Sequence, residues 1–333
     1  MQVQRPQRLA GLALLLGLLL LMTGLSLTVG ARAVPWGEIW AGMTGRIETI
    51  GAAAVAVRMP RTALAILAGA ALGLAGAVMQ GISRNPLADP GILGVNAGAA
   101  LFVVVGIAWF DISGAQSFLW LGIAGAGVTA VFVYLIGSAG QGGATPLKLT
   151  LAGTATSVAV SAFIIAVVLP RNDIAGSVQS WQVGGIGGAS FETLLPALPF
   201  ALVGLALSLA SARVLNALAL GEELATGLGQ SVALGRVMAA AGAVVLCGTA
   251  TALCGPIGFV GLVVPHLCRM IAGVDYRLVL PLSALAGASM LGLSDVLGRV
   301  IARPNELDVG IVTAFVGAPF FIWTVRNHRM RGL

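Results

Sequence analysis

The chain has 333 residues, of which 58% are hydrophobic and 9% are charged, whereas about 25% of the residues in a soluble domain carry charge. A soluble fold could not hide so much apolar surface, so most of the surface of this protein must face lipid. The net charge is +6, but the basic residues stand singly between apolar segments and form no patch with interleaved aromatic residues, which argues against nucleic-acid binding.

The first apolar run extends from Leu9 to Gly30 and follows Arg5 and Arg8. Residues 31–33 resemble the cleavage site of a secretory signal peptide, but the run of about 22 residues exceeds the roughly 7–15 residues of a signal-peptide core. We therefore expect a retained first transmembrane helix, with a cleaved signal as the alternative.

Nine further apolar stretches follow, each close to the length that crosses a bilayer. With the first run, the predicted spans are residues 9–30, 61–82, 91–110, 116–139, 150–170, 191–212, 236–254, 256–271, 278–302 and 310–326. The stretch at 256–271 is short and interrupted by Gly and Pro, so we expect it to be kinked or only partly spanning. The sequence predicts an all-α integral membrane protein with about ten transmembrane helices, in which residues 1–333 form one transmembrane domain.

Lys and Arg in the short loops predict the orientation. With ten spans and the N-terminus inside, eleven of the 18 basic residues lie inside and seven lie outside. Both termini are therefore predicted to be cytoplasmic. The predicted external loops cover residues 31–60 and 171–190, the second containing a short helix and a turn, and the longest cytoplasmic connection covers residues 213–235.

Residues 69–99 contain the clearest sign of transport. Gly69, Gly73 and Gly76 form a strip of small residues suited to close helix contact, and the polar turn RNPLADPG at 84–91 then interrupts the apolar pattern. Broken backbone and charge are tolerated in a membrane where protein or a water-lined path surrounds them. The candidate pathway or broken-helix residues are Gln80, Asn85, Pro86, Asp89 and Pro90. Alternatively, Asn85 and Asp89 only cap the turn and the helix that begins near Gly91.

The connection at 213–235 keeps a spaced set of leucines among polar residues, which fits a pair of short amphipathic helices on the cytoplasmic surface. Glu222 and Glu223 would occupy a first helical turn, where the helix dipole favours anions. Such a helix, exposing Thr226 and Gln230 as well, would be a docking surface for another protein. The alternative is a plain surface loop.

Six sequence blocks, in order and nearly from end to end, resemble the FecCD family of bacterial ABC importer permeases. The blocks are RMPR at 58–61, RNPLADPGILGVNAGA at 84–99, LTLAG at 149–153, LNALALGEELATGLG at 215–229, GPIGFVGLVVPHLCR at 255–269, and DVLGRV with NELDVGIVTAFVGAPFFIW over 295–323. The chain departs from the family pattern at 181–188, which is richer in Gly. The resemblance implies the type II ABC importer permease fold and a location in the bacterial cytoplasmic (inner) membrane.

The resemblance also implies partners and site residues. The coupling helices that sit in a groove of the ATPase subunit would include Leu220, Gly221, Glu222, Glu223, Ala225, Thr226, Leu228 and Gly229. Arg58, Arg61 and Arg299 would meet acidic residues of an extracytoplasmic substrate-binding protein. For each arginine a lipid-headgroup contact or a local ion pair is the alternative, and Asp295 lies four residues before Arg299. A second permease subunit, identical or related, and two ATPase subunits would complete the importer.

Other functions fit the sequence less well. The chain has no G-x-x-x-x-G-K-[ST] phosphate loop, so we expect a non-catalytic subunit that binds no cofactor, with ATP and Mg on the partner ATPase. An ion-coupled secondary transporter usually needs an ionisable group near the midplane, and the predicted spans offer none there. Cys247, Cys254 and Cys268 lack metal-ligand spacing and His266 stands alone, so no metal site or intramembrane enzyme is predicted.

The resemblance specifies the transported molecule less closely than it specifies the type of transporter. Family members move ferric siderophores, vitamin B12 or haem, and all three groups share the six blocks. The 84–99 block and the GRV at 298–300 are most similar to those of ferric-siderophore permeases of the enterobactin-like kind. We therefore expect an iron–siderophore complex, with haem or vitamin B12 as the alternative.

Overall fold

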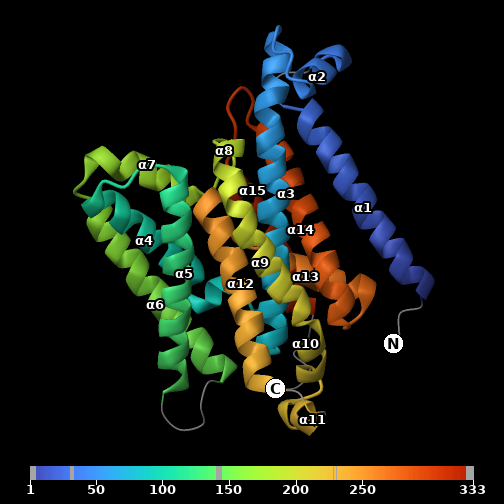
Figure 1. The fold of residues 1–333 in the computed structure, drawn as a ribbon, viewed down its shortest axis with the longest axis vertical. Helices are drawn as coiled ribbons and strands as arrows, with labels where there is room; N and C mark the ends of the chain where they lie inside the picture. The colour runs from blue at the N-terminus through green and yellow to red at the C-terminus, as the bar shows by residue number, and fades with distance from the viewer. Residues whose placement is uncertain (1–4, 31–33, 140–144, 228, 230, 328–333) are drawn as a thin grey trace.

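In the computed structural model the described part of the chain, residues 5–30, 34–139, 145–227, 229 and 231–327, forms helices joined by short turns, and no strand occurs within these residues (Figure 1). The long helices run along one axis of an elongated bundle. Helices α2 and α7 lie at one end, which we call the α7 end. Helices α10 and α11 lie at the other, the α11 end, where α1 also begins and α15 finishes (Figure 1).

The elements follow one another along the chain without long connections. They are α1 (Arg5–Thr28), α2 (Trp36–Met43), α3 (Ile50–Ser83), η1 (Pro90–Leu93), α4 (Val95–Phe110), α5 (Ala115–Ser138), α6 (Pro146–Val168), α7 (Asn172–Val183), α8 (Phe191–Leu194), η2 (Leu195–Ala197), α9 (Leu198–Ala210), α10 (Ala212–Leu218), α11 (Glu222–Gly227), α12 (Val232–Cys254), α13 (Val260–Ala272), α14 (Tyr276–Ile301) and α15 (Val309–Asn327), where η marks a 3-10 helix.

Each predicted span coincides with helical structure, but the helices differ in length. Among the described residues, seven helical stretches are long and apolar enough to cross a membrane, in α1, α3, α5, α6, α8 to α9, α12 and α14. Helices α4, α13 and α15 are apolar but shorter. The prediction that 256–271 is short or kinked is confirmed, because α13 begins only at Val260 and contains Pro265. An all-helical membrane fold is thus confirmed, while ten crossings stay a prediction.

The predicted external loop over residues 31–60 is largely helical in its described part, and its location outside the membrane stays a prediction. Residues 36–43 form α2, and α3 begins at Ile50, eleven residues before the predicted span. The segment from Gly51 to Val57 consists of Gly, Ala and Val and contains no helix-breaking pair, and Thr49 caps the helix by accepting a hydrogen bond from the Ala52 amide at 3.1 Å. Pro60 lies inside the helix, where it removes one backbone donor.

Helix α3 runs through the centre of the bundle and packs on α12, α13 and α14. The predicted strip of small residues makes these contacts. A Cβ atom at Gly69 or Gly73 would meet the backbone of Gly287 or Ser283 in α14, and one at Gly76 would meet the backbone of Gly261 in α13. Backbone against backbone gives the close helix contact that small residues permit in membranes.

The helical pattern is interrupted twice inside the bundle. Residues 84–94 leave α3 at the α11 end and lead to α4, which begins roughly halfway along α6, because a Cβ at Gly94 would lie 3.6 Å from Ser157 Oγ. Residues 255–259 leave α12 at the α7 end, where the Gly185 amide donates to the Cys254 carbonyl at 2.8 Å. They lead inward to α13. The two irregular segments therefore enter the bundle from opposite ends.

Candidate functional site

The predicted pair of short helices at 213–235 is present as α10 and α11. Gly221 joins them with a φ of 111°, a conformation that residues with a Cβ rarely adopt. On α11 the side chains of Glu222, Glu223 and Thr226 are exposed, while Ala225 is buried. Glu222 also forms an ion pair with Arg236 of α12. Of the other predicted coupling residues, Gly229 has a φ of 76°, and Leu228, like the neighbouring Gln230, lies outside the described residues.

The tip of this pair exposes apolar as well as acidic side chains. Leu220 and Leu224 are each 61% exposed, although leucines at the end of a bundle, beside carboxylates, have no lipid chain to face in the predicted orientation. An exposed mixture of leucine and glutamate on a rigid short helix is typical of a surface that another protein covers. The segment is therefore helical rather than a plain loop, and its docking to another protein stays a prediction.

At the α7 end, arginines from α3, from α14 and from the turn after α14 surround the last carbonyl groups of α1 (Arg5–Thr28) and those of the two residues that follow it. Arg58 Nη1 donates to the carbonyls of Leu27 and Thr28 at 3.1 and 3.2 Å. Arg299 Nη1 donates to the carbonyls of Ser26 and Val29 at 2.9 and 3.1 Å, and Arg303 Nη2 donates to Gly30 at 2.6 Å. Cations at a helix C-terminus satisfy its free carbonyls and complement its dipole.

Arg61 and Arg299 form a buried ion network around Asp295. Arg61 binds Asp295 Oδ1 through Nε at 2.9 Å and Nη2 at 2.7 Å, and Arg299 Nη2 lies 2.9 Å from Asp295 Oδ2. Asp295 and Arg299 are each 1% exposed. The alternative that Arg299 pairs with Asp295 one helical turn earlier is therefore confirmed. Arg61 also binds Glu306, whose side chain is 41% exposed, at 2.6 Å.

The predicted pathway residues separate into two groups. Asn85 and Asp89 cap the turn: Asn85 Oδ1 accepts from the Leu87 amide at 3.0 Å, and Asp89 Oδ1 accepts from the Gly91 amide at 2.8 Å. The capping alternative is therefore confirmed for both. Pro86 is exposed in this turn, and Pro90 is buried at the first position of η1.

Gln80 and Asp89 meet at the start of α13. Pro265 has no N–H, so the carbonyl of Gly261, four residues earlier, lacks its helical donor. Gln80 Nε2 supplies a donor instead, at 3.1 Å from Gly261 O and 3.3 Å from Leu262 O. The Asp89 carboxylate lies beside the same glycine, because a Cβ at Gly261 would be 2.9 Å from Asp89 Oδ2.

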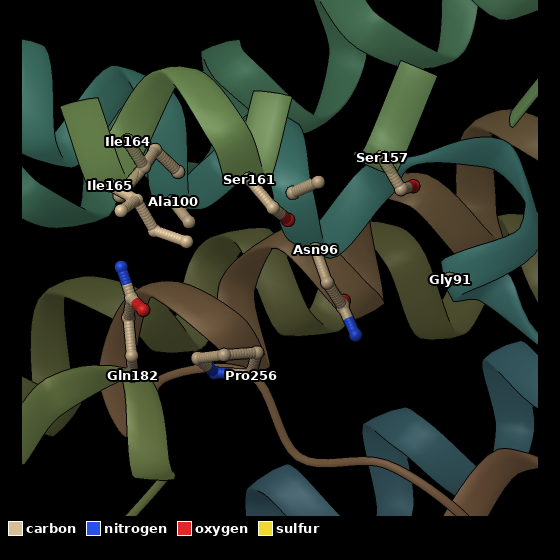
Figure 2. A pocket seen from close by; sticks show the side chains of 10 residues that line it. Gly91, Asn96, Ala100, Ser157, Ser161, Ile164, Ile165, Gln182 and Pro256 are labelled. Atoms are coloured by element: carbon tan, nitrogen blue, oxygen red, sulfur yellow. The ribbon is translucent and has the colours of Figure 1, made fainter. Parts of the chain in front are cut away.

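A cavity of about 280 Å³ lies next to the two irregular segments, between α4, α6 and α7 (Figure 2). Its polar side chains are Asn96, Ser157, Ser161 and Gln182, and none of its lining residues is charged. Asn96 is held from behind by α12, since its Oδ1 accepts from Thr251 Oγ1 at 3.0 Å and from Cys247 Sγ at 3.1 Å. Sequence reasoning missed this lining, because single Ser and Asn residues in apolar helices carry no spacing signal.

Among the described residues, seven apolar helical stretches of spanning length and three shorter ones, two of them entered through broken backbone, indicate a multi-pass membrane protein. The chain belongs to the FecCD transport family, whose model matches residues 18–327. It is therefore an ABC transporter permease of the siderophore, haem and citrate group, as its relatives are.

Two relatives that are named for particular cargoes match over almost the whole chain. The ferric enterobactin transport system permease protein FepD of Escherichia coli (strain K12) is 42% identical over 319 residues, covering 96% of this chain and 95% of the relative. The hemin transport system permease protein HmuU of Yersinia pestis is 34% identical over 330 residues, covering 98% and 97%.

A solved structure of a metal-chelate type ABC transporter in an inward-facing conformation has the same fold. Its TM-score is 0.83 at 29% sequence identity, and the match covers 96% of this chain and 99% of that chain. The chain therefore has the fold of an ABC transporter permease over almost its whole length.

Proposed function

We propose that this chain is the permease subunit of an ABC importer that moves a ferric siderophore across the bacterial cytoplasmic membrane. Ten spans would cross the membrane, with the α11 end and both termini in the cytoplasm. A second permease subunit, two ATPase subunits that bind ATP and Mg, and an extracytoplasmic binding protein would complete the machine. The observation that carries the proposal is the exposed α10–α11 pair, whose leucine and glutamate side chains offer a contact surface for a partner ATPase subunit.

The cavity fits a site that cargo passes through better than a site that binds cargo tightly. Its volume of about 280 Å³ is below the roughly 300–1,000 Å³ of sites that enclose a small-molecule ligand. Because the cavity is this small, one chain could touch only part of a chelate. The lining offers hydroxyl and amide groups but no charged group for that contact. Affinity and selectivity would then come from the separate binding protein.

We place the binding protein at the α7 end, where the arginine network lies. Arg61, bound to the half-exposed Glu306, is the member of the network nearest to solvent-exposed groups. Arg58 and Arg299 are 8% and 1% exposed, so in this proposal they act indirectly, by fixing the end of α1 beneath the docking surface. Charge complementarity at the rim would set register and association rate.

The cargo proposal is tested by uptake in cells that lack the chromosomal copy of this gene and carry it on a plasmid. We expect restored uptake of ⁵⁵Fe-enterobactin, because the enterobactin permease is more similar to this chain (42%) than the hemin permease is (34%). Labelled hemin and vitamin B12 are the matched controls. If uptake of hemin or vitamin B12 alone is restored, the proposed cargo is wrong but the proposal of an ABC importer stands. Uptake that persists after deletion of the partner ATPase gene would instead indicate an ion-coupled transporter.

A further inference from the structure

Helix α10 (Ala212–Leu218) is fastened to the first turn of α14 (Tyr276–Ile301) by one amide side chain. Asn216 Nδ2 donates to Asp275 Oδ1 at 2.7 Å, and Asn216 Oδ1 accepts from the Tyr276 amide at 2.8 Å. Asp275 in turn caps α14 by accepting from the Arg277 amide at 3.0 Å. Asn216 therefore uses both its donor and its acceptor to join α10 to the turn between α13 and α14.

Apolar packing reinforces this joint. Leu215 and Leu218 of α10 are fully buried. A Cβ at Gly81 of α3 would lie 3.0 Å from both the Leu215 side chain and the Tyr276 ring. Helix α10 and the start of α14 thus pack against the same glycine.

From Tyr276 the contacts continue into α13 (Val260–Ala272). The Tyr276 side chain interacts with Arg269 in the last turn of α13. Arg269 donates to Gln80 Oε1, and Gln80 Nε2 donates to the carbonyls of Gly261 and Leu262 in the first turn. Gln80 is 2% exposed, so this bond does not compete with water.

Together these contacts connect the α10–α11 pair, at the α11 end, to the irregular backbone inside the bundle. Gly261, the last member, lies beside Asp89, which caps η1. Coupling between distant sites travels through packed side chains and hydrogen bonds that shift together. Among the described contacts, these join the α10–α11 pair to the start of α13 in four steps.

We propose that Asn216 and Gln80 are positioning residues of the transport cycle, which transmit movement of the α10–α11 pair to the first turn of α13 and the adjoining Asp89 turn. This inference rests on the proposed function, since it needs an ATPase that moves the pair. The alternative is that the same contacts only hold the fold. The two differ in one quantity, the amount of cargo moved per ATP hydrolysed.

The test uses the complete importer in proteoliposomes, with ⁵⁵Fe-enterobactin uptake and ATP hydrolysis measured together. Asn216→Asp sets a carboxylate against Asp275, and we expect cargo moved per ATP to fall about tenfold, within the usual range of coupling between sites, while ATP hydrolysis continues. The double variant N216D/D275N restores one donor and one acceptor, and we expect the ratio to return. Asn172→Asp, an exposed position in the first turn of α7 and outside the arginine network, is the matched control.

The possible outcomes distinguish a failure of this inference from a failure of the proposed function. If the unchanged importer shows no ATP-driven uptake, the proposed function fails and the inference fails with it. If it transports and N216D keeps the same ratio, the inference alone is overturned. Should N216D not assemble, Gln80→Met removes the bonds to Gly261 and Arg269 at similar volume. An unchanged ratio in assembled Q80M complexes would likewise contradict the inference, and a fall in that ratio would support it.

Discussion

Replacing Asp295 by Asn is expected to destabilise the protein more than any other single change of one charged group. The carboxylate faces Arg61 and Arg299 at 2.7 and 2.9 Å and is almost fully buried. Neutralising it leaves Arg299 without its counter-ion and Arg61 with only the half-exposed Glu306, and breaking a buried ion pair costs about 3–5 kcal/mol. Arg299 also holds the end of α1, so that helix should loosen as well.

Glu306→Gln is the matched control for this prediction. Glu306 binds the same Arg61, at 2.6 Å, but its side chain is 41% exposed, and exposed ion pairs contribute about 0–1 kcal/mol. The free energy of unfolding would be measured by SDS titration in mixed micelles. Equal losses for D295N and E306Q would show that the network is not buried in the way described.

Gly76→Ala is the second change with a large expected effect. A Cβ at this position overlaps the backbone of Gly261 in α13, and backbone cannot rotate away as a side chain does. Overpacking typically costs about 1–3 kcal/mol. Because Gly261 lies beside Asp89 and accepts the Gln80 bond, we also expect uptake of labelled siderophore to fall.

Gly24→Ala in α1 is the matched control for the destabilisation expected of Gly76→Ala. No atom lies within 4 Å of a Cβ there, and Ala is favoured over Gly inside a helix by about 0.5–1 kcal/mol. G24A should therefore be neutral or stabilising by the same SDS titration. A G76A protein as stable as G24A would mean that α3 and α13 do not approach as closely as described.

The sequence predicts much of this fold because the strongest signals are local. Apolar runs locate the helices, and the glycines at 69, 73 and 76 identify the close helix contacts. Asn85 and Asp89 cap their turn, which the sequence offered as the alternative to a pathway role, since capping depends on residues one or two positions away. The short helix pair around Gly221 is equally local.

What the sequence does not reveal depends on partners far away in the chain. Arg58 and Arg299 read as surface charges, but their partners are the last carbonyls of α1, some 30 and 270 positions earlier. Gln80 reads as a polar group in a pathway. The sequence shows that Pro265 frees a carbonyl, yet it cannot say that Gln80, in another helix, supplies the donor.

A cross-link from α11 (Glu222–Gly227) tests most directly whether the α10–α11 pair is the ATPase contact of an importer half. With cysteine at Glu223 and a short thiol-to-amine cross-linker, membranes containing the assembled complex should yield an adduct with the ATPase subunit. Cysteine at Asp173 in α7, whose side chain is 61% exposed at the opposite end, should yield none. Absence of the adduct from position 223 in every nucleotide state, or equal adducts from both positions, would contradict the account.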